Sequence, residues 1–164
     1  MVIEHVALMK KILFVCTGNI CRSPTAHAIA RHKAKVLQQE NRFHFDSAGI
    51  ASYHVGEASD PRSVGLGEKN GISFSGIKAR QIKQKDFENF DLIMAMDRSH
   101  LRALQGMATV EAQNKIQLFL EFCEVENPWN DEVIDPYYLK HRDFDLVFKI
   151  TTKALDNLFE KLGD

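Results

Sequence analysis

The chain has 164 residues, 45% of them hydrophobic, and its 21 Lys and Arg nearly balance its 22 Asp and Glu. This length suits one domain with a substantial core, and the balanced charge excludes the basic surface typical of a nucleic-acid binder. The three cysteines form no Cys-x2-Cys pair, which excludes a disulfide framework or a common structural zinc site and favours a reducing, cytoplasmic setting.

Residues 1–9 are predicted to be an N-terminal extension, and residues 10–164 the folded domain. Glu4 and His5 interrupt the apolar residues of this extension, which is also too short for a secretory signal or a membrane span. We therefore expect no membrane partner.

An apolar run at residues 11–15 predicts the first strand, and an alanine-rich segment reaching about residue 37 predicts the helix after it. Between them lies the string Cys16-Thr17-Gly18-Asn19-Ile20-Cys21-Arg22-Ser23-Pro24. A loop of this length that opens a helix gathers backbone N–H groups at the positive end of the helix dipole, which suits a phosphate dianion. Gly18 and Asn19 can adopt backbone angles that most other residues avoid, which a tight loop requires.

Two side chains of this loop, Cys16 and Arg22, are predicted to converge on the same anion. The field of the loop favours the thiolate of Cys16, the form that acts as a nucleophile, and the Ser23 hydroxyl can donate to it. The planar guanidinium of Arg22 can hold two phosphoryl oxygens. Neither a Walker loop nor a dinucleotide-binding glycine pattern occurs, so the sequence does not indicate a nucleotide site.

The first helix is predicted to bury one face. Its members are Ala26, Ile29, Ala30, Ala34 and Leu37. His27 and His32 lie on the same helix but about 140° apart around its axis, so they cannot share a metal ion, and both are expected on the solvated surface. No metal or other cofactor is expected in the chain.

Further strands are predicted at residues 43–49, 91–96 and 115–120. A helix is expected to begin at Asp60-Pro61 and to end at Asn70-Gly71, and a short one should follow residue 85. Two more are expected at residues 98–104, capped by Asp97, and at residues 143–162, ended by Gly163. Residues 50–59, which include Tyr53, are expected to form an exposed loop. This alternation predicts a single three-layer α/β domain: a four-stranded parallel sheet with helices on both faces and a phosphate loop after the first strand.

A second motif, Val133-Ile134-Asp135-Pro136-Tyr137-Tyr138, supplies a carboxylic acid late in the chain. Alone, Asp-Pro indicates only a turn. Beside a nucleophilic thiolate, Asp135 is a candidate for the acid that protonates a phenolate leaving group.

The two motifs resemble the signature loop and the general-acid loop of the low-molecular-weight protein tyrosine phosphatases. The resemblance extends over nearly the whole chain from Lys11 on, with shorter matches at residues 46–49, 55–56, 60–62, 79–81 and 95–99. It implies a protein tyrosine phosphatase that works through a cysteinyl-phosphate intermediate. By resemblance, Cys16 is the nucleophile, Arg22 the phosphate clamp and Asp135 the general acid.

The resemblance also implies a substrate site around these three residues. Tyr53 and Tyr137 would form its walls and stack on the substrate ring, and Asn19 and Ser23 would shape the loop. The other expected members are Thr17, Gly18, Ile20 and Cys21. Where some relatives carry histidine in the network that supports the loop, this chain has Asn70. The expected partner is a phosphotyrosine-containing protein or a small aryl phosphate, and the expected state a monomer or weak dimer.

Three other functions stay open. Arsenate reductases on this fold need a relay of further cysteines, whereas only Cys21 and Cys123 remain here. Phosphoarginine phosphatases tend to have threonine where Ile20 stands and to lack the aromatic walls. A phosphate-binding module without catalysis would not need Cys16, Arg22 and Asp135 together.

Cys21 has two interpretations. It packs beneath the loop, as free cysteines often do, or it traps an oxidised Cys16 as a disulfide, as the resemblance implies. The second interpretation predicts a redox-sensitive enzyme.

Overall fold

The computed structural model describes residues 8–138 and 140–163. Most of the predicted extension at residues 1–9 therefore lies outside the described residues, and the two that are described, Leu8 and Met9, are exposed. In the part of the chain that is described, no helix is both long and apolar enough to cross a membrane.

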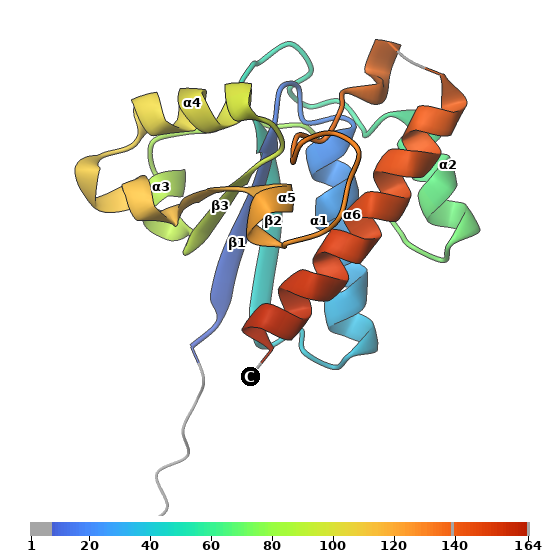
Figure 1. Cartoon of the computed structure of the whole chain (residues 1–164), viewed down its shortest axis with the longest axis horizontal. Coiled ribbons are helices and arrows are strands. Elements are labelled where there is room, and N and C mark those ends of the chain that lie inside the picture. The colour runs from blue at the N-terminus through green and yellow to red at the C-terminus, as the bar shows by residue number, and fades with distance from the viewer. Residues whose placement is uncertain (1–7, 139, 164) are drawn as a thin grey trace, which may run out of the picture.

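Four strands form one parallel sheet in the order β2-β1-β3-β4. Their bounds are Lys10–Cys16 for β1, Phe43–Gly49 for β2, Leu92–Ala95 for β3 and Ile116–Leu118 for β4. The α-helices are α1 Arg22–Val36, α2 Pro61–Lys69, α3 Asp86–Asn89, α4 Arg98–Met107, α5 Phe119–Phe122 and α6 His141–Leu162, with 3-10 turns η1 Val110–Lys115 and η2 Pro136–Tyr138. Figure 1 shows these elements in chain order.

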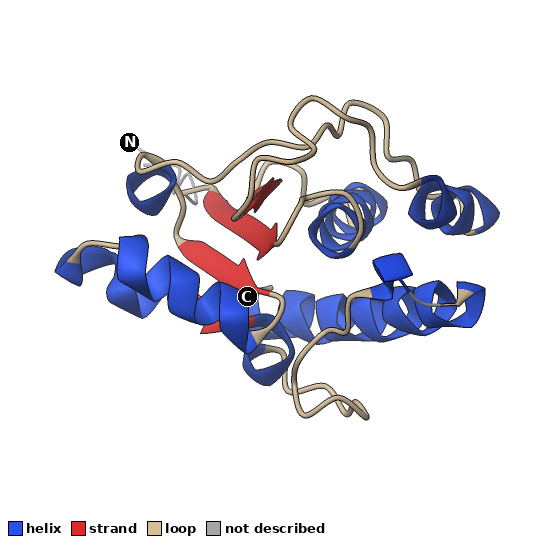
Figure 2. Cartoon of the chain, turned by 90° about the horizontal axis from the view of Figure 1, so that it is seen from above, coloured by secondary structure: helices blue, strands red, loops and turns tan. Residues whose placement is uncertain are grey.

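The two faces of the sheet bury different side chains because successive residues of a strand point to opposite sides. Ile12 and Phe14 of β1 pack with α1 and α6, whereas Leu13 and Val15 pack with residues of α3 and α4. Seen from above, α1, α2 and α6 lie on one side of the sheet and α3 and α4 on the other (Figure 2). The predicted three-layer α/β domain is confirmed.

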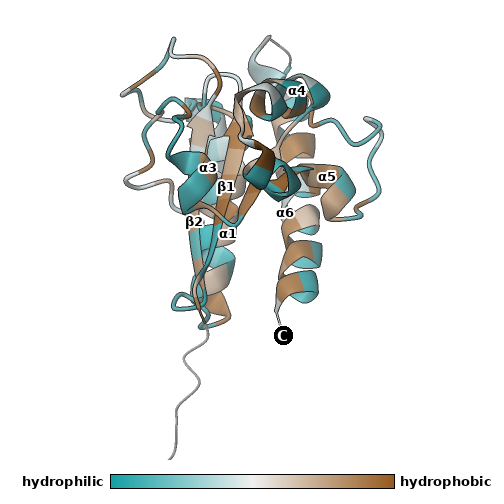
Figure 3. Ribbon diagram, turned by 90° about the vertical axis from the view of Figure 1, so that its left-hand side faces the viewer, coloured by the Kyte–Doolittle hydropathy of each residue, from teal (hydrophilic) through white to brown (hydrophobic). Residues whose placement is uncertain are grey.

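The last helix, α6, has the regular apolar pattern that allowed it to be predicted from sequence. Its apolar residues form one stripe against the sheet, and the helix alternates brown and teal along its length in Figure 3. Its observed start, His141, lies two residues before the predicted one. The cap at Asp60 and the left-handed residue that ends α2, Gly71 with φ +70°, are as predicted.

Two expectations about α1 are wrong. His27 is buried, with Nδ1 3.0 Å from Ser47 Oγ, because α1 is covered by β2, α2 and α6 rather than along one stripe. Leu37, expected inside, is 51% exposed because the helix ends at Val36.

The fourth predicted strand is also too long. The chain leaves β4 after Leu118 and turns into α5, where Phe119 and Leu120 are both fully buried. An unbroken apolar run has no period that would separate a strand from a short buried helix.

Candidate active site

The loop at residues 16–22 connects β1 to α1 at the carboxyl edge of the sheet, as the sequence predicted. Its carbonyl oxygens bond outward: Cys16 O accepts from Ile50 N, Thr17 O from Ala51 N and Ile20 O from Asp60 N, all within 2.9 Å. By contrast, the backbone N–H groups of residues 17–21 have no acceptor within residues 8–138 and 140–163. A ring of unpaired donors at a helix N-terminus is an anion site.

Asn19 has the left-handed backbone expected of it, with φ +59°. The expectation for Gly18 is wrong, since its φ is not in the left-handed region. A side chain there would instead meet the ring of His54, because a Cβ atom on Gly18 would lie 2.8 Å from His54 Cδ2. Gly18 therefore leaves room for the ring of His54.

Cys16 lies at the base of the site and is only 3% exposed. Its Sγ is 2.9 Å from Ser23 Oγ, and Ser23 Oγ accepts from Asn19 Nδ2 at 2.8 Å. The single Ser23 proton has two possible acceptors, the sulfur at 2.9 Å and Ala48 O at the longer distance of 3.5 Å, so Ser23 is placed to donate to the sulfur. Asn19 is held in turn by Arg80 N, which donates to its Oδ1 at 3.0 Å.

Arg22 is held by groups from three segments. Its Nη1 donates to Asp97 Oδ2 at 2.9 Å and to Val133 O at 3.0 Å, and its Nη2 donates to Thr17 Oγ1 at 3.3 Å. Burial alone would raise the pKa of Asp97, but hydrogen bonds from Ser99, the nearby His100 and the charge of Arg22 outweigh it, and the net pKa is lowered. Asp97 therefore stays ionised and fixes the guanidinium.

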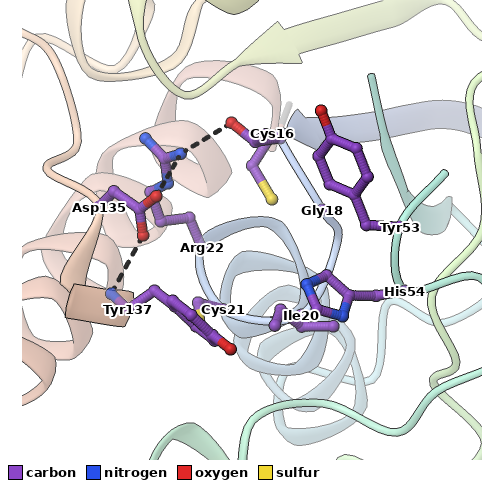
Figure 4. Close-up of a pocket in the computed structure, with 10 residues that line it drawn as sticks. Cys16, Gly18, Ile20, Cys21, Arg22, Tyr53, His54, Asp135 and Tyr137 are labelled. Atoms are coloured by element: carbon purple, nitrogen blue, oxygen red, sulfur yellow. Dashed lines mark hydrogen bonds and ion pairs between the residues drawn. The ribbon is translucent and has the colours of Figure 1, made fainter. Parts of the chain in front are cut away.

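The candidate acid, Asp135, lies across the pocket from the sulfur (Figure 4). Its Oδ2 is 3.6 Å from Arg22 Nη2, and its Oδ1 accepts from Tyr137 N at 3.0 Å. The preceding Val133 anchors this segment to the sheet by donating its N–H to Met96 O at 2.8 Å. The structure thus brings the two predicted motifs together over more than 110 residues of sequence.

The pocket between these groups has a volume of about 140 Å³. Tyr53 and His54 stand on the side opposite Asp135 and Tyr137, with Ile20 and Cys21 below (Figure 4). The lining residues are Cys16, Thr17, Gly18, Ile20, Cys21, Arg22, Tyr53, His54, Asp135 and Tyr137. Two predicted members, Asn19 and Ser23, are buried and support the loop rather than line the pocket. This volume is below that of typical drug-sized sites, so the pocket suits a small group such as a phosphate.

Sequence reasoning missed two residues of the site, His54 and His100, and misplaced a third, Asn70. His54 lines the pocket, and its Nδ1 contacts Glu57, but its loop has no periodic pattern that could have indicated this. His100 contacts Thr17. The only sequence signal for this was its place in the first turn of α4, just after the Asp97 cap, which puts it at the carboxyl end of the strands. Asn70, expected to support the loop, instead donates to Leu66 O at the end of α2.

Cys21 is buried, and its thiol donates to Asp60 Oδ2 at 3.7 Å. Burial raises the pKa of the Cys21 thiol well above its usual range, and the charge of Asp60 adds to the effect. Cys21 is therefore a thiol at neutral pH. In the described part of the chain all three cysteines are free, and no group of three potential metal ligands is assembled.

A family model described as low molecular weight phosphotyrosine protein phosphatase matches residues 11–164. The phosphatase of that description from Saccharomyces cerevisiae is 36% identical over 142 residues, which are 86% of this chain and 88% of the yeast protein. Its counterpart from Schizosaccharomyces pombe is 41% identical over 130 residues, 78% of this chain and 81% of that protein.

Two crystal structures are similar throughout. YfkJ from Bacillus subtilis superposes with a TM-score of 0.88 at 35% identity and covers 96% of both chains. A protein tyrosine phosphatase from Entamoeba histolytica with Hepes in its active site has a TM-score of 0.87 at 36% identity, covering 94% of this chain and 97% of the other.

Proposed function

This chain belongs to the low molecular weight phosphotyrosine protein phosphatase family and is a protein tyrosine phosphatase, and from that premise we propose that Cys16, Arg22 and Asp135 carry its reaction. The observation that supports this assignment is their convergence on one small pocket beside unpaired backbone N–H groups.

In the first step the Cys16 thiolate attacks phosphorus. An S–P bond forms while the P–O bond to the aryl group breaks, and the carboxylic acid of Asp135 gives its proton to the departing phenolate oxygen. The backbone N–H groups of residues 17–21 and the Arg22 guanidinium stabilise the charge on the three equatorial oxygens.

In the second step water hydrolyses the cysteinyl phosphate. Asp135, now a carboxylate, accepts a proton from the water as its oxygen bonds to phosphorus and the S–P bond breaks. Inorganic phosphate leaves and the Cys16 thiolate is restored. Ser23, whose hydroxyl lies 2.9 Å from the sulfur, stabilises the thiolate as leaving group.

Phosphotyrosine is the substrate class best supported. Tyr53, His54 and Tyr137 give the pocket aromatic walls above a small anion site, and a flat phenyl ring fills such a gap. We propose that the protein acts as a monomer or weak dimer on phosphotyrosine-containing proteins or small aryl phosphates in the cytoplasm, without nucleic-acid or membrane partners. Its near-neutral charge and free cysteines support this setting.

We also propose that residues 10–164 are the catalytic domain and residues 1–9 an extension without a catalytic part. The start of β1 at Lys10 supports this boundary. Removing residues 1–8 is expected to leave the turnover of an aryl phosphate unchanged.

The decisive experiment is rapid mixing with p-nitrophenyl phosphate. A burst of nitrophenolate and a phosphorylated Cys16 after acid quench are expected, whereas release of phenolate without a phosphoenzyme would contradict the mechanism. A parallel assay with phosphotyrosine, phosphoserine, phosphoarginine and arsenate should give turnover chiefly with phosphotyrosine.

The matched variant is Cys16→Ser. Its hydroxyl is far less nucleophilic, while the loop amides and Arg22 remain, so turnover should be abolished and inorganic phosphate should still bind. Substantial turnover by this variant would show that Cys16 is not the nucleophile.

A further inference from the structure

The hydroxyl of Thr17 makes two hydrogen bonds whose direction can be assigned. Its Oγ1 lies 2.8 Å from His100 Nε2 and 3.3 Å from Arg22 Nη2. A guanidinium has no acceptor, so Thr17 accepts from Arg22. The role of the Thr17 proton therefore depends on the state of His100.

His100 is fixed as a neutral imidazole with its proton on Nε2. Asp97 N donates to Nδ1 at 3.2 Å, so Nδ1 is an acceptor. Asp97 Oδ1 lies equally far from Nδ1, but a proton on Nδ1 would face the Asp97 N–H group, whose direction the backbone fixes. Burial and the charge of Arg22 together lower the pKa of His100 to about 4, against the opposing charges of Asp97, Asp135 and Glu132. A neutral imidazole carries one N–H group, which here must be on Nε2 and is donated to Thr17.

Thr17 Oγ1 thus accepts two hydrogen bonds and both of its lone pairs are occupied. With His100 protonated on Nε2, no hydrogen bond among the described residues gives the Thr17 proton an acceptor. Thr17 is exposed and lines the pocket with Cys16 and Arg22. A phosphoryl oxygen of a substrate bound in that pocket would be an acceptor for the Thr17 proton.

We propose that the Thr17 hydroxyl donates a hydrogen bond to a phosphoryl oxygen of the bound substrate, and that His100 is the positioning residue that directs this hydroxyl. The proposal rests on the proposed function and adds a side-chain donor to the backbone amides and Arg22. From sequence, Thr17 is expected only to be one of the residues of the substrate site.

The geometry of α4 explains how His100 can hold the hydroxyl in one orientation. Asp97 accepts from His100 N at 3.1 Å with Oδ1 and from Arg22 Nη1 at 2.9 Å with Oδ2. The same carboxylate therefore fixes the start of α4 and the guanidinium, and His100 and Arg22 approach Thr17 from a shared support. The side chain of His100 is 3% exposed, which leaves it little freedom.

The first test compares Thr17→Val, which removes the hydroxyl at nearly the same shape, with Thr17→Ser, which keeps it. A hydrogen bond to a charged acceptor predicts that Thr17→Val raises the inhibition constant of inorganic phosphate by about tenfold or more and lowers kcat/KM for an aryl phosphate similarly. Thr17→Ser should stay within about threefold of the parent. The control is Thr152→Val, because the Thr152 hydroxyl bonds to Phe148 O within α6.

The second test separates the two nitrogens of His100. In His100→Asn the amide can replace Nδ1 as acceptor for Asp97 N but cannot reach Thr17, whereas in His100→Gln the amide can replace the Nε2 donor. Phosphate affinity should fall more in His100→Asn than in His100→Gln. The His100→Asn change should have no further effect once Thr17→Val is present, because the two act through one hydroxyl.

The outcomes distinguish this proposal from the proposed function. Unchanged phosphate affinity in Thr17→Val, with the parent active and Cys16→Ser inactive, overturns the hydroxyl donor and leaves the phosphatase mechanism standing. Equal losses from His100→Asn with and without Thr17→Val overturn the positioning role and make His100 a structural residue of α4. A parent that forms no phosphoenzyme contradicts the proposed function instead. Equilibrium binding of phosphate gives these answers even if turnover is too slow to measure.

Discussion

Asp135 occupies the open side of the pocket, where its side chain is 42% exposed and 3.6 Å from Arg22. A group placed there can reach the leaving oxygen of a substrate whose phosphorus lies over Cys16. The Tyr137 N–H bonded to its Oδ1 leaves Oδ2 as the oxygen nearest to Arg22.

Asp135→Asn should slow phenyl phosphate much more than p-nitrophenyl phosphate. A phenolate of high pKa needs the proton, whereas nitrophenolate leaves well without it, so we expect roughly a hundredfold or greater loss for the former. Presteady-state rates of phenol release across a series of leaving groups measure the difference. Parallel losses across the series would show that Asp135 acts on something other than the leaving group.

The redox prediction concerns Cys21. Peroxide should oxidise the Cys16 thiolate to a sulfenic acid, and Cys21 should displace its oxygen as water, forming a disulfide that dithiothreitol reduces. Because Cys21 is buried and is a thiol bonded to Asp60, disulfide formation should be slow compared with that of an exposed thiol.

Activity recovered after mild peroxide and dithiothreitol is the measurement, with Cys21→Ser expected to recover far less than the parent. Cys123→Ser is the control because Cys123 is buried away from the pocket, near Lys161. Full recovery by Cys21→Ser, or peptide maps without a bond between Cys16 and Cys21, would leave Cys21 as a packing residue.

The residues that sequence could identify are those whose chemistry depends on a local string. Cys16 and Arg22 are six positions apart on one loop, and Asp135 stands in a distinctive Asp-Pro-Tyr-Tyr string. His100 and His54 reach the site from separate segments, and nothing in their own neighbours specifies the partner. The orientation of the Thr17 hydroxyl depends on long-range contacts of this kind.

At the scale of elements, Arg62 joins the start of α2 to the segment that carries Asp135. Its Nε and Nη2 bond both oxygens of Asp60 at 3.0 and 2.9 Å, and Nη2 also donates to Tyr137 O at 3.2 Å. Its guanidinium lies 4.2 Å from the ring centre of Phe144 in α6. Arg62 thus connects α2 and α6 to Tyr137 of η2, which lines the pocket.

Arg62→Gln should therefore loosen the position of the acid more than that of the phosphate site. We expect about a tenfold fall in kcat for phenyl phosphate and a much smaller one for p-nitrophenyl phosphate, since only the former needs the proton. Arg42→Gln is a matched control: Arg42 also bonds a backbone carbonyl, Gly163 O, and lies over a ring, Phe43, at the far end of the sheet. The idea fails if both substrates slow by the same factor.

The elements most faithful to the sequence are those with both a period and a terminal signal. α2 had Asp60-Pro61 at its start and Gly71 after its end, and β2 was predicted with its observed bounds. α5 and the short β4 had neither, because four or fewer residues show no period. The strand order was also beyond sequence reasoning, since it depends on which crossovers pack together.

For the whole molecule, buried histidine makes stability depend on pH. Burial lowers the pKa of His27 from the usual 6.5 to about 4, with Arg31, His44 and Arg80 lowering it and Asp46 opposing. The unfolded chain therefore binds more protons between pH 6.5 and 4, so this stability is present above pH 6.5 and is lost as the pH falls towards 4. The contribution reaches about 3 kcal/mol, from 1.36 kcal/mol per pKa unit.

Urea unfolding at pH 7 and pH 4.5 should show this loss, and His27→Asn should reduce it because an amide that replaces Nδ1 near Ser47 does not titrate. His32→Asn serves as the control on the same helix, where the side chain is only partly buried. An unchanged difference between the two pH values in His27→Asn would assign the acid sensitivity to other groups, His100 among them.

The segment that follows β2 continues to pair with the chain beyond the sheet. Ile50 and Ala51 donate to Cys16 O and Thr17 O, and Gly49 lies so close that an added Cβ would be 2.7 Å from Thr17 O. The conformational entropy of the 16–22 loop is thus lost during folding rather than when the anion arrives. The amides are preorganised, so most of the free energy of phosphate binding remains available as affinity. The loop should therefore have the same conformation before and after phosphate binds.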